Sequence, residues 1–150
     1  WVNLPFAALA AAYTAFLFKQ CEGRDLWQGS LLLPQLLGQA IFLGALAFVP
    51  FAGTLSTLAW VGWCGFFVHT MVALLEWKLP HRSANARQAA GFLGRVRLWS
   101  LPAFAVGLAL VFAAQLGAHF VPPIAFVLAF LGLLFHEHAF VRAGQLPPLS

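Results

Sequence analysis

Long apolar stretches, interrupted by short polar ones, run through most of this chain. Each stretch is close to the ~20 residues that a helix needs to cross the hydrocarbon core of a bilayer. A membrane β-barrel shows alternating segments of about ten residues, whereas these stretches are continuous and rich in Leu, Ala, Phe and Gly. The pattern predicts one all-α bundle over residues 1–150 with five transmembrane helices, bounded by Leu4 to Lys19, Leu31 to Phe51, Leu55 to Trp77, Trp99 to Ala118 and Pro122 to Val141.

The longest segment outside these spans, residues 79–97, has a helical pattern of its own. We expect a cytoplasmic loop with a short interfacial helix, whose apolar side lies among lipid headgroups while its arginines contact phosphates. A docking face for a cytoplasmic partner is the alternative. The apolar positions at helical spacing are Ala86, Ala89, Ala90, Leu93 and Val96.

The composition excludes an ordinary soluble domain. Hydrophobic residues make up 62% of the chain and charged residues 8%, against about 45–50% and 25% in soluble domains. The net charge of +4 does not indicate nucleic-acid binding, because basic residues of a polytopic membrane protein set its topology and contact lipid. The two cysteines, Cys21 and Cys64, form no recognisable disulfide framework or metal motif.

The basic residues predict the orientation in the membrane. With five spans, all eight Lys and Arg residues fall on one side, and short loops rich in them stay cytoplasmic. We expect Ser150 in the cytoplasm and the loop near Gly53 in the periplasm of a bacterial inner membrane. The chain begins with Trp1 and has no initiator Met, so we expect a processed chain or a fragment with an odd number of helices upstream.

Pairs of small residues four positions apart favour close helix packing in lipid, although chance pairs are common in a chain rich in Ala and Gly. The pairs are Ala40 with Gly44, Ala103 with Gly107, Ala113 with Gly117 and Ala125 with Ala129.

Ionisable residues inside predicted spans are the candidates for chemistry, because a bilayer makes them costly. Glu76 and His69 are seven positions apart on one helix face, with Thr70 alongside, and can form a proton path or contact a quinone head group. Alternatively, Glu76 reaches the interface and His69 bonds to a neighbouring helix. A second cluster comprises His136, Glu137 and His138, and is either a proton relay or an interfacial cap, of which we favour the cap.

His69 and His136 are expected at similar depth on different helices, so they are the one candidate pair of axial haem ligands. No second pair accompanies them in the sequence.

The loop between the first two spans combines charges of both signs with an aromatic anchor, which predicts a structured turn. Tyr13-Thr-Ala-Phe-Leu-Phe, then Gly23-Arg-Asp-Leu-Trp-Gln and Leu32-Leu-Pro34, resembles the central signature of the NrfD/PsrC family, the membrane subunits of polysulfide reductase-like complexes. The segment from Glu137 through Ala143-Gly-Gln to Pro148-Leu-Ser resembles that family's C-terminal segment. His81-Arg-Ser-Ala-Asn-Ala resembles the intervening cytoplasmic loop.

The resemblance implies the last five helices of a subunit with eight or more. Such a subunit exchanges electrons between menaquinone or ubiquinone and a ferredoxin-like 4Fe–4S subunit, which feeds a molybdopterin catalytic subunit, and it carries no haem itself. The family's quinone pocket is attributed to helices that this chain lacks, so no quinone-contacting residue is carried over. The residues that match family motifs, with a structural or proton-conducting role, are Arg24, Asp25, Trp27, Gln28, Glu76, His81, Glu137, Gly144 and Gln145.

Three classes of function remain at this stage. A quinone-linked electron-transfer anchor leads, and a haem b subunit and a transporter or structural module are the alternatives. The chain alone is not expected to be an enzyme, because no nucleophile triad, phosphate-binding loop or metal-ligand cluster is recognisable in it.

Overall fold

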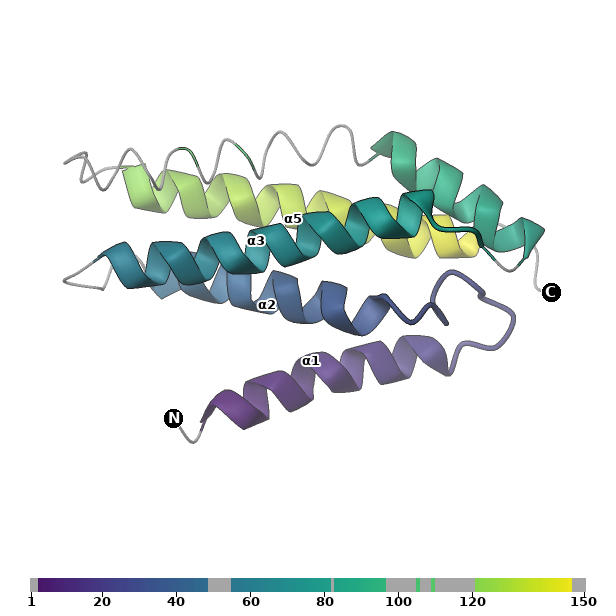
Figure 1. The fold of residues 1–150 in the computed structure, drawn as a ribbon, viewed down its shortest axis with the longest axis horizontal. Coiled ribbons are helices and arrows are strands. Elements are labelled where there is room, and N and C mark those ends of the chain that lie inside the picture. The colour runs from purple at the N-terminus through teal and green to yellow at the C-terminus, as the bar shows by residue number, and fades with distance from the viewer. Residues whose placement is uncertain are drawn as a thin grey trace.

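The computed structural model describes residues 3–48, 55–81, 83–96, 105, 109 and 121–146. Its regular structure in these ranges is entirely helical (Figure 1). The helices are α1 (Asn3–Lys19), α2 (Leu32–Phe48), α3 (Leu55–Lys78), a shorter helix at residues 84–96, and α5 (Val121–Gln145).

The predicted spans agree well with the helices that the structure describes. α1 and α3 match within a residue of each predicted end, α2 is described to Phe48, and α5 extends beyond the predicted Val141. The fourth predicted span lies outside the described residues except for Ala105 and Ala109, as does the turn at residues 51–54. Among the described residues, two helices are long and apolar enough to cross a membrane, over Thr57–Glu76 and Ile124–Gln145. A bundle of five spans stays a prediction.

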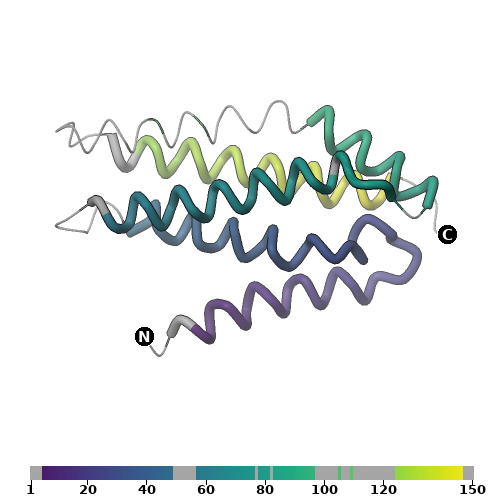
Figure 2. Tube along the Cα trace, in the orientation of Figure 1, coloured from purple at the N-terminus to yellow at the C-terminus, as the bar shows by residue number. Residues whose placement is uncertain are grey.

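The long helices lie side by side, with α2 antiparallel to α1, α3 and α5 (Figures 1 and 2). α2 contacts each of the other three, and its contact with α3 is the most extensive. The loop at residues 20–31, the end of α3, helix 84–96 and the end of α5 gather at one end of the bundle, which we call the loop end. Lys19, Lys78 and Arg142 lie in the last turns of their helices, so these three basic residues lie at the loop end, in agreement with the predicted segregation of charge.

Helix 84–96 packs its apolar side on the bundle. Its apolar side is buried against Trp27, Leu32 and Phe140, and the buried positions on the helix are Ala86, Ala89, Ala90 and Leu93. The expected contact between this side and lipid headgroups was therefore wrong, because the protein itself supplies the apolar partner. Arg87 and Arg95 are exposed on the other side.

The middle of the bundle depends on two glycines that the search for small pairs missed. A Cβ at Gly65 would lie 2.6 Å from the backbone N of Phe42, and one at Gly38 would lie 2.9 Å from the backbone N of His69. α2 and α3 thus touch backbone to backbone, the contact that small residues permit in membrane bundles.

Only one of the predicted small pairs is confirmed as a packing position. Ala125 and Ala129 are fully buried beside Phe42 and Leu133. Ala40 and Gly44 are exposed, and a Cβ at Gly44 would meet nothing within 4 Å, so that prediction was wrong. The other two pairs lie outside the described residues.

The outward faces of the helices are strongly apolar. Phe6 on α1, Trp60 and Phe67 on α3 and Ile124 on α5 are each more than half exposed, and many Leu and Val side chains accompany them. Soluble monomers rarely leave so many large apolar side chains uncovered.

Candidate functional site

Five polar side chains from three helices meet inside the apolar bundle. Gln35 and Gln39 on α2, His69 on α3 and His136 on α5 are all buried, and Glu137 on α5 is half-buried. We call these five residues the interior polar cluster. Such groups are costly in an apolar interior unless they bond to one another.

Hydrogen bonds between α2 and α5 connect four members of this cluster. Gln39 Nε2 donates to Glu137 Oε1 over 2.7 Å. Gln35 Nε2 lies 2.9 Å from His136 Nε2, and the amide donates there when the imidazole carries its proton on Nδ1. Two neighbouring residues of α5 are thereby tied to two glutamines one turn apart on α2.

His69 and His136 lie together, as the expected similar depth suggested. Their ring centroids are 4.9 Å apart and their planes are perpendicular. In such an edge-to-face pair, one ring turns its face, and none of its nitrogens, toward the other ring. Axial haem ligands instead aim a ring nitrogen at an iron and a porphyrin plane between them. This arrangement does not fit the weak alternative of haem ligation by His69 and His136.

The second predicted cluster is divided by the structure. His136 and Glu137 belong to the interior polar cluster, whereas His138 is exposed. Two of the three side chains thus face the bundle and one faces outward. Their interpretation as a proton relay or as an interfacial cap stays a prediction.

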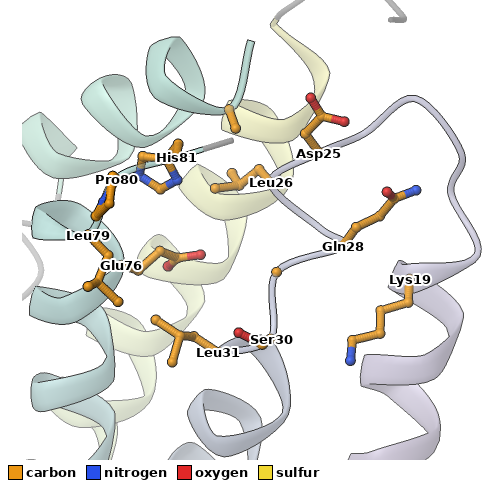
Figure 3. Close-up of a pocket in the computed structure, with 12 residues that line it drawn as sticks. Lys19, Asp25, Leu26, Gln28, Ser30, Leu31, Glu76, Leu79, Pro80 and His81 are labelled. Atoms are coloured by element: carbon orange, nitrogen blue, oxygen red, sulfur yellow. The ribbon is translucent and has the colours of Figure 1, made fainter. Parts of the chain in front are cut away.

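Glu76 lies at the loop end of α3, on the same buried side of the helix as His69. It lines a cavity of about 460 Å³ between the ends of α1 and α3, the loop and the start of helix 84–96. Figure 3 shows the Glu76 carboxylate turned from α3 toward the loop, with His81 on the same wall and Lys19 across the opening. The polar residues that line the cavity are Lys19, Asp25, Gln28, Ser30, Glu76 and His81.

The family-motif residues of the loop hold the end of α5. Arg24 Nη1 donates to the carbonyl oxygens of Gly144 (3.0 Å) and Gln145 (3.1 Å). The last carbonyls of a helix have no partner within the helix, and a cation there also interacts favourably with the helix dipole. Trp27 packs directly on Gly144, where a Cβ would collide with the indole ring, and its Nε1 lies 3.5 Å from the Phe140 carbonyl oxygen.

Asp25 connects the same loop to helix 84–96. The Ser83 hydroxyl donates to Asp25 and accepts a hydrogen bond from the backbone N of Ala86 (3.0 Å), which makes Ser83 the N-cap of that helix. Gln28 Nε2 donates to the Cys21 carbonyl oxygen (3.3 Å) within the loop. The predicted structured turn is confirmed. Gly23, with φ of 75°, supplies its left-handed residue.

The sequence-predicted residues therefore form three sets, two at the loop end and one in the bundle interior. Arg24, Trp27, Gly144 and Gln145 are packed together as a structural unit, while Asp25, Gln28, Glu76 and His81 line the cavity. His69, His136 and Glu137 lie deeper, in the interior polar cluster.

Sequence reasoning missed Gln35, Gln39 and Ser83. Two glutamines one turn apart in an otherwise apolar span would have been a usable signal, since both lie on one face. Among the residues described, no group of three His, Cys, Asp or Glu side chains is arranged to hold a metal ion.

Comparison with known protein families, with curated protein sequences and with solved structures found no match to this chain.

Proposed function

We propose that this chain belongs to the integral membrane subunit of a respiratory oxidoreductase complex that exchanges electrons between the quinone pool and an iron–sulfur partner. In this proposal the chain forms the last five spans of a larger NrfD/PsrC-like subunit in a bacterial inner membrane, and the loop end faces the cytoplasm. The resemblance of the loop, of the segment around His81 and of the C-terminal segment to that family supports it.

The observation that carries the proposal is the interior polar cluster together with the buried Glu76. Ionisable side chains kept inside an apolar bundle are by default functional in membrane proteins. Interhelical hydrogen bonds in membranes contribute only about 0.6 kcal/mol on average, which is a weak reason to keep two carboxylates and two imidazoles there. Proton transfer gives a better reason.

Quinone chemistry needs proton-exchanging groups. Oxidation of a quinol to a quinone releases two electrons and two protons, and the electrons pass to the 4Fe–4S partner and then to the molybdopterin subunit. The groups of this chain that can accept or pass such protons are Glu76, His69 and Glu137, with His136 in contact with His69. Gln35 and Gln39 hold His136 and Glu137 in position.

The partners are the most direct test of this function. The full chain, tagged and purified in mild detergent from its native membranes, is expected to bring along one protein with 4Fe–4S clusters and one with molybdenum. Electron paramagnetic resonance and metal analysis detect both. Reduction of the clusters by an added menaquinol or ubiquinol analogue supports the proposal, and purification of the chain alone with no redox centre in any bound protein contradicts it.

A proton-coupled transporter is the second candidate, favoured by the contact between His69 and His136 and by Glu137 inside the bundle. Such residues are also found on substrate and proton pathways of transporters. Absence of iron–sulfur partners, together with proton uptake coupled to a solute in vesicles, would favour it. A b-type haem spectrum that is lost in His69→Ala would favour the haem alternative.

A further inference from the structure

The cavity at the loop end has the properties of a water-filled chamber. Its volume of about 460 Å³ is room for roughly fifteen water molecules, given about 30 Å³ for each. Lys19, Asp25, Gln28 and Ser30 from the α1 and loop side face Glu76 and His81 from the α3 side. Water in such a space finds the several polar partners that it needs.

His81 lines this cavity but keeps one ring nitrogen out of contact with it. Its Nε2 atom is buried and has no hydrogen-bond partner among the residues that the structure describes, although the ring lines the cavity. A buried polar atom without a partner costs about 1–3 kcal/mol. A turn of the ring toward the cavity would bring this atom into contact with water and remove that cost.

The charged residues on the cavity wall suit water and protons as ligands better than an anion. Its titratable groups are Lys19 from α1, Asp25 from the loop, Glu76 from α3 and His81 from the segment after α3. The two carboxylates disfavour a phosphate or a lipid phosphodiester. A carboxylate and an imidazole on one wall are groups that can pass protons to and from water.

Glu76 lies where this chamber meets the bundle interior. It is only 6% exposed, yet it lines the cavity. His69, on the same buried side of α3, is seven residues deeper, which is about 10 Å along the helix axis. Glu76 is thus the first ionisable group between the chamber and the interior polar cluster.

We infer that the cavity at the loop end is the aqueous access route by which Glu76 exchanges protons with one side of the membrane, with His81 as the second proton-exchanging group on its wall. Water, as hydronium or as a chain of hydrogen-bonded molecules, is its ligand. The inference rests on the proposed function only for the use of these protons in quinone chemistry.

Thiol accessibility tests whether the cavity holds water. In the full chain with Cys21→Ser and Cys64→Ala, Leu31→Cys places a thiol on the cavity wall, and Leu74→Cys places one on the exposed apolar face of α3. A charged, membrane-impermeant methanethiosulfonate is added to vesicles of either orientation. Leu31→Cys is expected to react at least ten times faster than Leu74→Cys, and only from the loop-end side. Ser30→Cys replaces Leu31→Cys if that variant does not fold.

Infrared difference spectroscopy tests the proton exchange itself. At a pH low enough to protonate Glu76, the carboxyl band that disappears in Glu76→Gln is expected to shift within seconds when deuterium oxide is added at the loop-end side. His81→Gln is expected to slow that exchange at least fivefold while the protein stays folded.

The outcomes separate this inference from the proposed function. Equal protection of Leu31→Cys and Leu74→Cys, or a carboxyl band that exchanges only from the opposite side, overturns the access route whatever the complex does with quinols. If thiol labelling and carboxyl exchange occur as expected but the purified chain binds no redox partner, the access route is supported and the proposed function is overturned.

Discussion

At the loop end, a few single residues hold the first loop against the end of α5. Arg24 and Trp27 come from the first loop, yet their contacts are with the end of α5. The sequence predicted that this loop is structured, because opposite charges and an aromatic residue surround a glycine. It could not predict the partners, since hydrogen bonds to backbone carbonyls more than a hundred positions away leave no trace in local spacing.

Gly144 provides the sharpest test at this scale. A Cβ there would collide with the Trp27 indole, so Gly144→Ala is expected to lower the stability of the full chain in detergent by about 1–3 kcal/mol, as overpacking does. Gly91→Ala is the matched control, because a Cβ at Gly91 meets nothing within 4 Å in an exposed part of a helix. It is expected to be neutral or slightly stabilising. Equal thermal stability of the two variants would show that Trp27 does not pack on Gly144.

Arg24 is expected to act as a cap for α5. Arg24→Gln removes a cation that donates to two terminal carbonyls, and we expect a loss of about 1.5–3 kcal/mol. Arg87→Gln is the control, since Arg87 is exposed on helix 84–96. Thermal unfolding in detergent measures both. A similar small effect for each variant would mean that water satisfies those carbonyls equally well.

At the scale of elements, hydrophobic length predicted where helices lie but not which of their faces meet. α1, α2, α3 and α5 agree with the predicted spans wherever the structure describes them. The pairing of α2 with α3 depends on Gly38 and Gly65, which lie on different helices. A search for small residues four apart on one helix therefore found Ala40 and Gly44, which are exposed, and missed the real contact.

The close contact between α2 and α3 predicts that a larger residue at Gly65 lowers stability. Gly65→Ala places a Cβ 2.6 Å from the Phe42 backbone N, so the two helices must move apart by several tenths of an ångström. We expect a loss of about 1–3 kcal/mol. Gly62→Ala, three residues away, meets the Ala45 Cβ at 3.5 Å, an ordinary contact, and is expected to be tolerated. Denaturation in mixed detergent micelles compares the two, and equal effects would contradict the backbone-to-backbone contact.

Only part of the candidate site could be predicted from the sequence, and the limit has a physical reason. Ionisable residues in apolar spans are conspicuous, so His69, Glu76, His136 and Glu137 were found from the sequence. Glutamines are less conspicuous, so Gln35 and Gln39, which bond to two of them, were missed. The cavity could not be predicted, because it forms between segments that meet only in the folded chain.

At the scale of the whole molecule, charge and apolar surface are segregated. Apolar side chains cover the outward faces of the helices, and the basic residues at the ends of α1, α3 and α5 lie at the loop end. The positive-inside rule then predicts that this end is cytoplasmic. Alkaline phosphatase, which is active only in the periplasm, is expected to be active when fused near Gly53 and inactive when fused after Ser150. Activity of the fusion after Ser150 would reverse the topology.

We propose that the buried carboxylate of Glu76 serves quinone chemistry. Glu76→Gln keeps the shape and hydrogen-bonding capacity of the side chain but removes its exchangeable charge. The decisive measurement is the rate at which a quinol analogue reduces the iron–sulfur clusters of the assembled complex, with equal assembly shown by co-purification. The account predicts a rate more than tenfold lower in Glu76→Gln. An unchanged rate in a fully assembled complex would contradict it and leave Glu76 as an interfacial anchor.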